Sequence, residues 1–350
     1  MRIFVALLFI SFKVFGLELN HQIDFLTKQQ KNDNFSGIKY NIKGNHFMDD
    51  DLIAFHVKTQ QTNKNKHDFT DVTEFYWDRT SDDYSVKIGV DKEFWGKAEL
   101  INVVDVINQK NNLGLETKEK LGELMAKFSH FKEDDVYSFY YLPYFREQEF
   151  SDMTVANTSF EHKKSSFALR YASVIDNIDF GLSYFNGVDK NPEFSPNGSK
   201  FDVYYPNLKQ FGVDAQLTLE NILWKLEFAK KYYQGKNHHS SVYGFEYLLG
   251  TQWDIGILFE SMQDTDSNLF ADDVMLGLRI ALNDEDSSSG LIALNYDREH
   301  HSKMLNVSLE KRFGDDIKLS IKSQSLFDKE DDTFLTNRNN NTSATLAYYF

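Results

Sequence analysis

The final ten residues, NTSATLAYYF, place apolar side chains at every second position. Leu346, Tyr348 and Phe350 share this period, which is that of a β-strand with one apolar face. The same alternation runs through DIKLSIKSQ, MLNVSLEKR, VMLGLRIAL, WDIGILFE and ILWKLEFAK. Strands of this kind predict an all-β protein whose sheet has one apolar face and one polar face.

The lengths of the connections between the strands indicate how the apolar face is covered. Short turns join the strands in pairs, at 175–177, 219–221, 249–251 and 313–316. Longer polar segments separate the pairs, at 188–207, 234–239, 263–270 and 327–340. Short turns at one end and long loops at the other are typical of an outer-membrane barrel, in which lipid covers the apolar face and closure leaves no unpaired edge.

We therefore expect a transmembrane antiparallel β-barrel of about 16 strands, with 14 or 18 as alternatives. The expected strands are 36–43, 50–60, 68–79, 83–93, 134–145, 163–174, 177–187, 208–218, 221–233, 240–249, 251–262, 271–283, 288–298, 302–312, 315–326 and 341–350. A secreted β-sandwich or lipocalin-like barrel would alternate too. The strand number disfavours it, as do glycines among the charges of the polar face, which suit a crowded lumen wall.

The first residues, MRIFVALLFISFKVFG, predict a secretory signal peptide cut near Gly16. Arg2 supplies the basic start, and the apolar run at 3–12 is too short to span a membrane. The alternative is a buried N-terminal strand or helix. We expect residues 17–350 to form the barrel, exported through the periplasm to the outer membrane of a Gram-negative cell.

Composition excludes several classes of protein. The chain of 350 residues has no cysteine, which excludes disulfides and thiol chemistry. Its formal charge of −15 argues against nucleic acid as a partner. Aromatic residues make up 15% of the chain, as suits a sheet with one apolar face.

One segment, 93–131, breaks the alternation. Its part at 117–127 has helical spacing, with Thr117 as a possible N-cap. So long a segment between strands predicts a functional role. By strand parity it begins and ends on the periplasmic side. We expect 98–130 either to fold into the lumen as a plug or to lie beneath the barrel, and as a plug to narrow the pore through Glu99, Asp105, Asn108 and Gln109.

Charged residues on the polar face are candidates for the lumen. Pairing across neighbouring strands is the simpler interpretation, and a transverse field between acidic and basic walls is the alternative. The candidates for the lumen or its constriction are Glu93, Trp95, Glu99, Asp105, Asn108, Gln109, Arg170, Asp214, Lys225, Glu227, Glu246, Glu260 and Arg279.

The sequence shows no catalytic arrangement. It contains no Gly-x-Ser-x-Gly motif, and His56 faces inward with no evident serine nearby. The pairs His238-His239 and His300-His301 fall in expected loops, where solvated side chains are a better interpretation than a metal site. The stretch 264–269 has Leu269 where a calcium loop needs glycine. We expect no enzyme activity, no metal and no cofactor.

Successive blocks resemble a family of proteobacterial outer-membrane porin-like proteins. They include FWGKAELINVVDVINQKN, KLGELMAKF, FYYLPYFREQEF, IDFGLSYFNGVDKNPEF, YYPNLKQFGVDAQ, DDVMLGLRIALNDEDSSSG and LAYYF, in order from about residue 84 to the end. The resemblance implies an outer-membrane barrel and supplies no solute. The terminal strand with Leu346, Tyr348 and Phe350 also resembles the signal recognised by the barrel-assembly machinery.

These observations predict a passive porin for a small solute. One alternative is export or trafficking of a hydrophobic molecule such as a lipid across the outer membrane, and another is a structural or adhesive surface protein. The expected partners are outer-membrane lipid, the assembly machinery and the solute. Whether the protein is a monomer or a trimer stays open.

Overall fold

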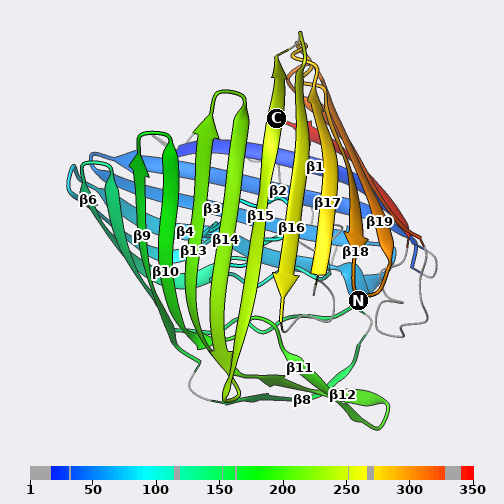
Figure 1. Ribbon diagram of the computed structural model, residues 1–350. Helices are drawn as coiled ribbons and strands as arrows, with labels where there is room; N and C mark the ends of the chain where they lie inside the picture. Colours follow the sequence, from blue (N-terminus) through cyan, green and yellow to red (C-terminus); the bar gives the residue numbers. More distant parts are fainter. Residues whose placement is uncertain are drawn as a thin grey trace.

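The chain folds into a closed antiparallel β-barrel. The structure, a computed structural model, describes residues 17–30, 33–113, 119–151, 153–161, 164–250, 252–265, 272–327 and 340–350. In these ranges 18 strands form one sheet (Figure 1). The first strand pairs with both the second and the last, which closes the sheet. The expected signal peptide at 1–16 lies outside the described residues.

The barrel strands are β1 (Leu17–Gln30), β2 (Phe35–Met48), β3 (Asp51–Thr62), β4 (Phe69–Thr80), β5 (Tyr84–Asp91), β6 (Glu123–Lys132), β7 (Asp135–Leu142), β9 (Ser166–Ile175), β10 (Ile178–Val188), β13 (Asn207–Leu219), β14 (Ile222–Tyr233), β15 (Lys236–Gly250), β16 (Asp254–Asp264), β17 (Asp272–Ala281), β18 (Ser289–Asp297), β19 (Lys303–Phe313), β20 (Ile317–Phe327) and β21 (Asn341–Tyr349). A 3₁₀ helix, η1 (Asn65–His67), follows β3.

The two faces of the wall follow the alternation of the sequence. In β16, Gly256, Leu258 and Glu260 are buried on the inner side, while Ile257 and Phe259 between them reach the outer surface. In β21, Leu346 and Tyr348 are exposed on the outer side, and Phe350 continues their row. Alternating side chains of a pleated strand must point to opposite faces, so the sequence period predicts the outer face correctly.

Two barrel strands, β1 and β6, are absent from the expected list. β1 precedes the first expected strand. With this additional strand, the long segment between β5 and β6 begins and ends at the opposite end of the barrel from the one expected. That segment leaves and rejoins the wall at the end where β1 meets β2 and β3 meets β4, which we call the loop end. The opposite, short-turn end holds the turns after β2, β9 and β13, as well as the start of β1 and the end of β21. Strand parity predicted that both ends of the segment lie at the short-turn end, and this is wrong because both lie at the loop end.

The helix expected at 117–127 is also wrong over its described part. Residues 123–127 belong to β6, which pairs with β5 and β7. Leu124 faces outward, but the next residue, Met125, is buried inside. Apolar residues on both faces remove the alternation and imitate helical spacing. No helix among the described residues is long and apolar enough to cross a membrane.

The connection at 234–239, expected as a long loop, is a tight hairpin. β14 ends at Tyr233 and β15 begins at Lys236. Gln234 and Gly235 both have positive φ angles, 49° and 75°. Two such residues form the type of two-residue turn that matches the twist of antiparallel strands, and glycine adopts this conformation without a steric penalty.

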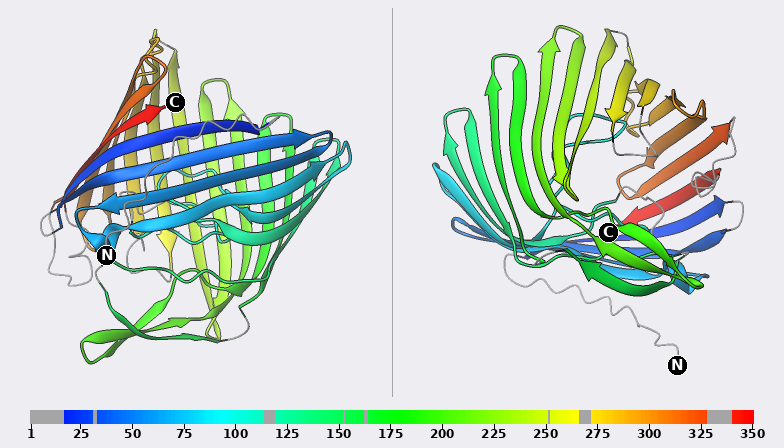
Figure 2. Two further views of the ribbon diagram at one scale, coloured as in Figure 1. Left: turned by 180° about the vertical axis from the view of Figure 1, so that it is seen from behind. Right: turned by 60° about the horizontal axis from the view of Figure 1, so that its bottom comes forward.

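A small second sheet lies at the loop end (Figures 1 and 2). It contains β11 (Glu193–Asn197), β12 (Lys200–Tyr205) and β8 (Val155–Phe160), with β8 and β12 parallel. A separate apolar cluster of Phe145, Val188, Val203 and Tyr205 supports it. The sequence pattern did not predict this sheet, because its strands are short and lie within polar connections.

Candidate functional site

The connection between β5 and β6 passes through the inside of the barrel. We call residues 92–113 and 119–122 the inner segment. It starts and ends at neighbouring points of the wall, because Asp91 and Glu123 are cross-strand partners. Trp95, Val104 and Ile107 of this segment are buried in one apolar cluster with residues of the inner face of the wall. Those wall residues include Tyr140, Phe185, Leu258, Met262 and Met275.

Two wall carboxylates hold the backbone of the inner segment. The amides of Lys97 and Ala98 donate to Glu227 Oε1 at 2.6 and 2.8 Å, and the amide of Val103 donates to Glu227 Oε2 at 2.8 Å. Glu227 is 0% exposed. Backbone amides of an irregular segment need acceptors when they are buried, and the two oxygens of one carboxyl group accept three of them here.

Glu260 has the same role for two amides that lie between those bound by Glu227. Its Oε1 accepts from the amide of Glu99 at 2.8 Å, and its Oε2 accepts from the amide of Leu100 at 2.7 Å. Gly96 makes the close approach of Glu227 possible. A Cβ atom at this position would lie 2.5 Å from Glu227 Oε1, and the φ angle of 101° also favours glycine. The inner segment is thus fixed against β14 and β16.

Charged side chains surround the point where the segment comes nearest to the short-turn end. Glu99 lies 2.7 Å from Arg279 Nη2 and 3.4 Å from Lys225 Nζ. Both cations also approach Glu246, at 3.2 and 3.6 Å. Burial alone raises the pKa of Glu99, but Lys225 and Arg279 outweigh it and lower that pKa. The side chains of Arg279 and Glu99 remain 40% and 34% exposed, so this cluster meets water within the lumen.

A second ion pair is built into the inner wall next to Trp95. Arg170 donates from both terminal nitrogens to the two oxygens of Asp214, each at 2.9 Å. The guanidinium carbon also lies 5.2 Å from the centre of the Trp95 ring. Gly181 leaves room for the pair, because a Cβ there would lie 2.4 Å from Arg170. This pair orders the wall and contacts the inner segment.

The first and last parts of the inner segment are fastened to β6 and to each other. Glu93 accepts from Lys127 at 2.8 Å and from the Tyr140 hydroxyl at 3.2 Å. Asn108 Oδ1 accepts a hydrogen bond from the amide of Glu93, and its Nδ2 donates to the carbonyls of Asp91 and Leu121. Asp105 forms a buried ion pair with Lys120. Gln109 donates to the carbonyl of Lys190 at 3.1 Å.

The thirteen lumen candidates of the sequence therefore lie on or beside the inner segment, and most charges are paired. Local pairing explains these charges better than two separated walls of opposite sign. Sequence reasoning missed Lys120 and Lys127, which both contact Glu93. It also missed Lys97, which pairs with Asp179. The partners are distant in sequence, so no local pattern could have found them.

The wall formed by β19 and β20 differs from the packed side. Its inward residues are mostly polar and partly exposed, among them Asn306, Ser308, Ser320 and Gln324. Lys318 pairs with Glu310 at 2.7 Å, and Arg312 lies over the ring of Tyr349 on β21. We call the inward face of β19 and β20 the open wall. Water reaches these side chains from inside the barrel.

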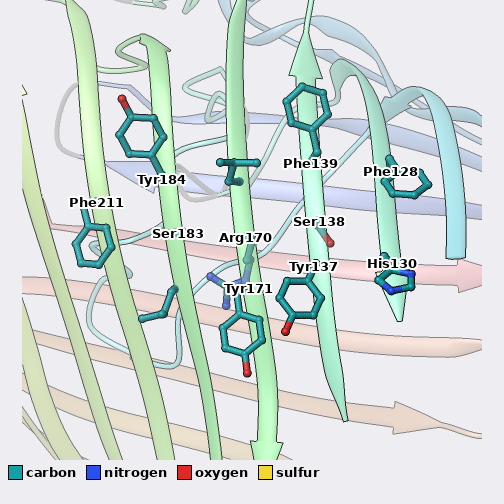
Figure 3. Close-up of a pocket in the computed structure, with 12 residues that line it drawn as sticks. Phe128, His130, Tyr137, Ser138, Phe139, Arg170, Tyr171, Ser183, Tyr184 and Phe211 are labelled. Atoms are coloured by element: carbon teal, nitrogen blue, oxygen red, sulfur yellow. The ribbon is translucent and has the colours of Figure 1, made fainter. Parts of the chain in front are cut away.

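The outer surface carries an apolar groove of about 430 Å³ over β6, β7, β9, β10 and β13 (Figure 3). Phe128, Phe139, Leu169, Leu182 and Phe211 line it, with His130, Tyr137 and Tyr171 towards the short-turn end. An apolar band bordered by aromatic residues with polar tips is typical of a surface that meets lipid.

No group of three or more potential metal-binding side chains occurs in the described ranges. His300 Nδ1 instead lies 3.1 Å from Asp297, and His238 stacks on Tyr233. His56, the inward histidine of β3, lies 3.9 Å from Glu74.

The fold and the lumen define a porin-like class of barrel. OccK3 (OpdO) of Pseudomonas aeruginosa is similar with a TM-score of 0.62 at 8% identity, over 95% of each chain. A loop L8 deletion mutant of OmpT, an outer membrane protein of Vibrio cholerae, is similar with a TM-score of 0.51 at 10% identity, over 95% of this chain and 99% of that chain. No protein-family model and no curated protein matches the sequence.

Proposed function

We propose that this protein is an outer-membrane channel through which a small polar solute passes between the inner segment and the open wall. The observation that carries the proposal is the pair of wall carboxylates, Glu227 and Glu260, which fix an irregular segment inside a closed barrel. Glu99 of that segment and Arg279 of the wall beside it stay partly exposed. A fixed constriction with water-accessible charges is the arrangement by which pores select solutes.

The location in the outer membrane is part of the same proposal. The closed sheet, the apolar outer band and the porin-like fold support it. The resemblance of the sequence blocks to proteobacterial porin-like proteins agrees with it. Lipid around the barrel and the assembly machinery are the partners that this location requires.

Passage of a hydrophobic molecule is less well supported. The apolar residues of the inner wall, such as Leu258, Met262 and Met275, are already covered by the inner segment. The inward side chains of the open wall are mostly hydroxyls, amides and charges. A lipid moving along that surface would face polar groups that lose their hydration without gaining hydrogen bonds.

Conductance in planar bilayers tests the proposal. Replacing residues 93–121 by a Gly/Ser linker of about four residues is geometrically feasible, because Asp91 and Glu123 are already neighbours. The original barrel should conduct, and the replacement should raise single-channel conductance several-fold. The matched control replaces residues 195–201, the tip of the β11–β12 hairpin, and should leave conductance unchanged.

Two results would contradict the channel. One is an assembled wild-type barrel that never conducts, together with an assembled replacement that does not conduct either. The other is a replacement whose conductance equals that of the wild type, because the inner segment would then not border the path of ions. The control separates both results from a general effect of shortening a connection.

A further inference from the structure

The last part of the inner segment forms a finger that reaches the rim of the barrel at the loop end. Lys110 and Lys120 form an antiparallel bridge, the amide of Asn111 donates to the carbonyl of Glu119 at 2.7 Å, and the amide of Leu121 donates to that of Gln109 at 2.8 Å. We define the finger as residues 109–113 and 119–121. Leu113 is buried at its described tip.

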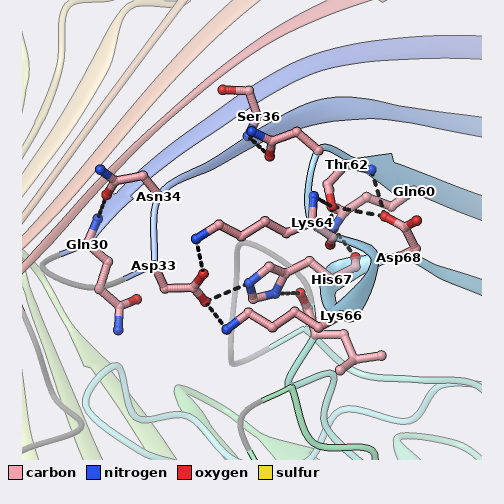
Figure 4. Close-up of polar contacts among 12 residues, drawn as sticks. Gln30, Asp33, Asn34, Ser36, Gln60, Thr62, Lys64, Lys66, His67 and Asp68 are labelled. Atoms are coloured by element: carbon pink, nitrogen blue, oxygen red, sulfur yellow. Dashed lines mark hydrogen bonds and ion pairs between the residues drawn. The ribbon is translucent and has the colours of Figure 1, made fainter.

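His67 contacts this tip from the wall. It lies in η1, between β3 and β4, and its ring stacks on Phe35 with 4.0 Å between ring centres. Its Nδ1 is 3.1 Å from the carbonyl oxygen of Leu113, and its Nε2 is 2.7 Å from Asp33 Oδ2 (Figure 4). The residue is only 5% exposed, so water does not readily replace either contact.

Both contacts of the ring are to hydrogen-bond acceptors. A carbonyl oxygen cannot donate, and a carboxylate does so only when protonated. Burial alone raises the pKa of Asp33, but its bonds to Lys64, Lys66 and His67 hold that pKa well below the usual range. Asp33 is therefore a carboxylate, and both ring nitrogens of His67 must carry a proton to make the two hydrogen bonds. The geometry describes an imidazolium.

The charges around His67 come from the connection between β1 and β2, from η1 and its flanks, from the finger and from β3. Asp33, between β1 and β2, favours the imidazolium, while Lys64 before η1 and Lys66 within η1 oppose it, at 2.7 and 2.8 Å from Asp33. Asp68 is directed to Thr62, from which it accepts two hydrogen bonds. On the finger, Glu119 pairs with Lys58 of β3. Of the groups named here His67 is the imidazole, and its proton count decides whether both ring contacts are hydrogen bonds.

We propose that His67 is a proton-dependent latch that fastens the finger of the inner segment to the rim of the barrel. After the loss of one proton, the ring has a single N–H group, which can donate to only one of the two acceptors, Asp33 and the carbonyl of Leu113. If Asp33 keeps that N–H, a nitrogen lone pair faces the carbonyl oxygen of Leu113, and the two repel. Rising pH therefore releases the tip of the finger, and falling pH fastens it. The latch depends on where the finger lies and not on the proposed passage of solutes.

A nitroxide spin label on the finger tests the latch directly. The chain has no cysteine, so Asn112→Cys gives a single labelling site next to Leu113. In the otherwise unchanged barrel the label should be immobilised at about pH 5.5 and several-fold more mobile at about pH 8.5, with the steepness of a single proton. A label at Ile101→Cys, where the segment is held by β14 and β16, is the control and should not respond.

Two variants assign the transition to His67. His67→Gln can donate to only one of the two acceptors, so the Asn112 label should be mobile at both pH values. His67→Arg donates to both acceptors at every pH, so the label should stay immobilised. Equal mobility of the wild-type label at both pH values overturns the latch, and so does a His67→Gln barrel that titrates like the wild type. Conductance is recorded separately, so failure of the channel leaves this result intact.

Discussion

Phe350 and His21 exchange a pair of backbone hydrogen bonds. The amide of each donates to the carbonyl of the other at 3.1 Å, and the two rings stack with 5.4 Å between their centres. The pairing of β1 with β21 thus extends to the final residue of this chain. In a barrel this seam is where the sheet closes, and every backbone group along it would otherwise face lipid unpaired.

We predict that deletion of Phe350 prevents assembly. It removes both hydrogen bonds to His21 and an outward aromatic ring at the seam. The deleted protein should be missing from outer-membrane fractions and lack heat-modifiable migration on gels. Phe350→Tyr keeps the backbone and the ring, and it should assemble normally. Deleted protein at the wild-type level in the membrane would show that the seam does not need this residue.

Adjacent residues of β20 test the two faces of the wall. Ile321 faces outward near the middle of the strand, and Ser320 faces the lumen. Ile321→Arg should lower the free energy of unfolding by about 2–4 kcal/mol near the bilayer midplane. Ser320→Arg should cost far less, because its side chain meets water. Urea unfolding in lipid measures both, and equal losses would contradict the assignment of faces.

Glu227→Gln and Glu260→Gln should loosen the inner segment. Each replacement turns one acceptor oxygen into an NH₂ group that faces a backbone amide. Hydrogen bonds to charged groups contribute about 1.5–3 kcal/mol, so a loss of this order in unfolding free energy is expected, with noisier single-channel currents. Glu310→Gln on the open wall is the control, with a change within about 0.5 kcal/mol. If the currents of both variants are as quiet as those of the wild type, Glu227 and Glu260 do not anchor the inner segment.

Arg279→Glu should shift ion selectivity towards cations. The substitution places an acid beside Glu99 at the partly exposed charge cluster. Reversal potentials in a KCl gradient measure the shift. Arg79→Glu, on the outer side of β4 at the short-turn end, is the matched control and should leave the reversal potential unchanged. The same shift in both variants would mean that selectivity follows total charge rather than this cluster.

The charge cluster also predicts a pH dependence. The pKa of Glu99 is lowered in the folded protein, so its ion pairs contribute fully above the unfolded value of about 4.3 and are lost as pH falls through the lowered pKa. The part of the selectivity that depends on Glu99 should stay constant from neutral pH down to about 4.3 and change only below it. Glu99→Gln should abolish that acid change. A change centred near neutral pH that persists in Glu99→Gln would assign the effect to another group.

Sequence alone determined the class of fold and the outer face. The alternation of Ile255, Ile257 and Phe259 identifies lipid-facing positions because the pleat of a strand is a local property. The break in alternation at 93–131 also identified a segment that leaves the wall, although the last part of this range is β6. Each of these conclusions depends on neighbours within a few residues.

Only the tertiary structure decided what the inner face meets. Leu258 and Met125 are apolar and yet face inward, because the inner segment covers them. β6 was missed because Leu124 faces outward while its neighbour Met125 is buried inside, which removes the alternation. Glu227 accepts hydrogen bonds from the amides of Lys97 and Val103, which lie 130 and 124 positions earlier in the sequence. Such pairings depend on the closure of the whole sheet, and no local period contains them.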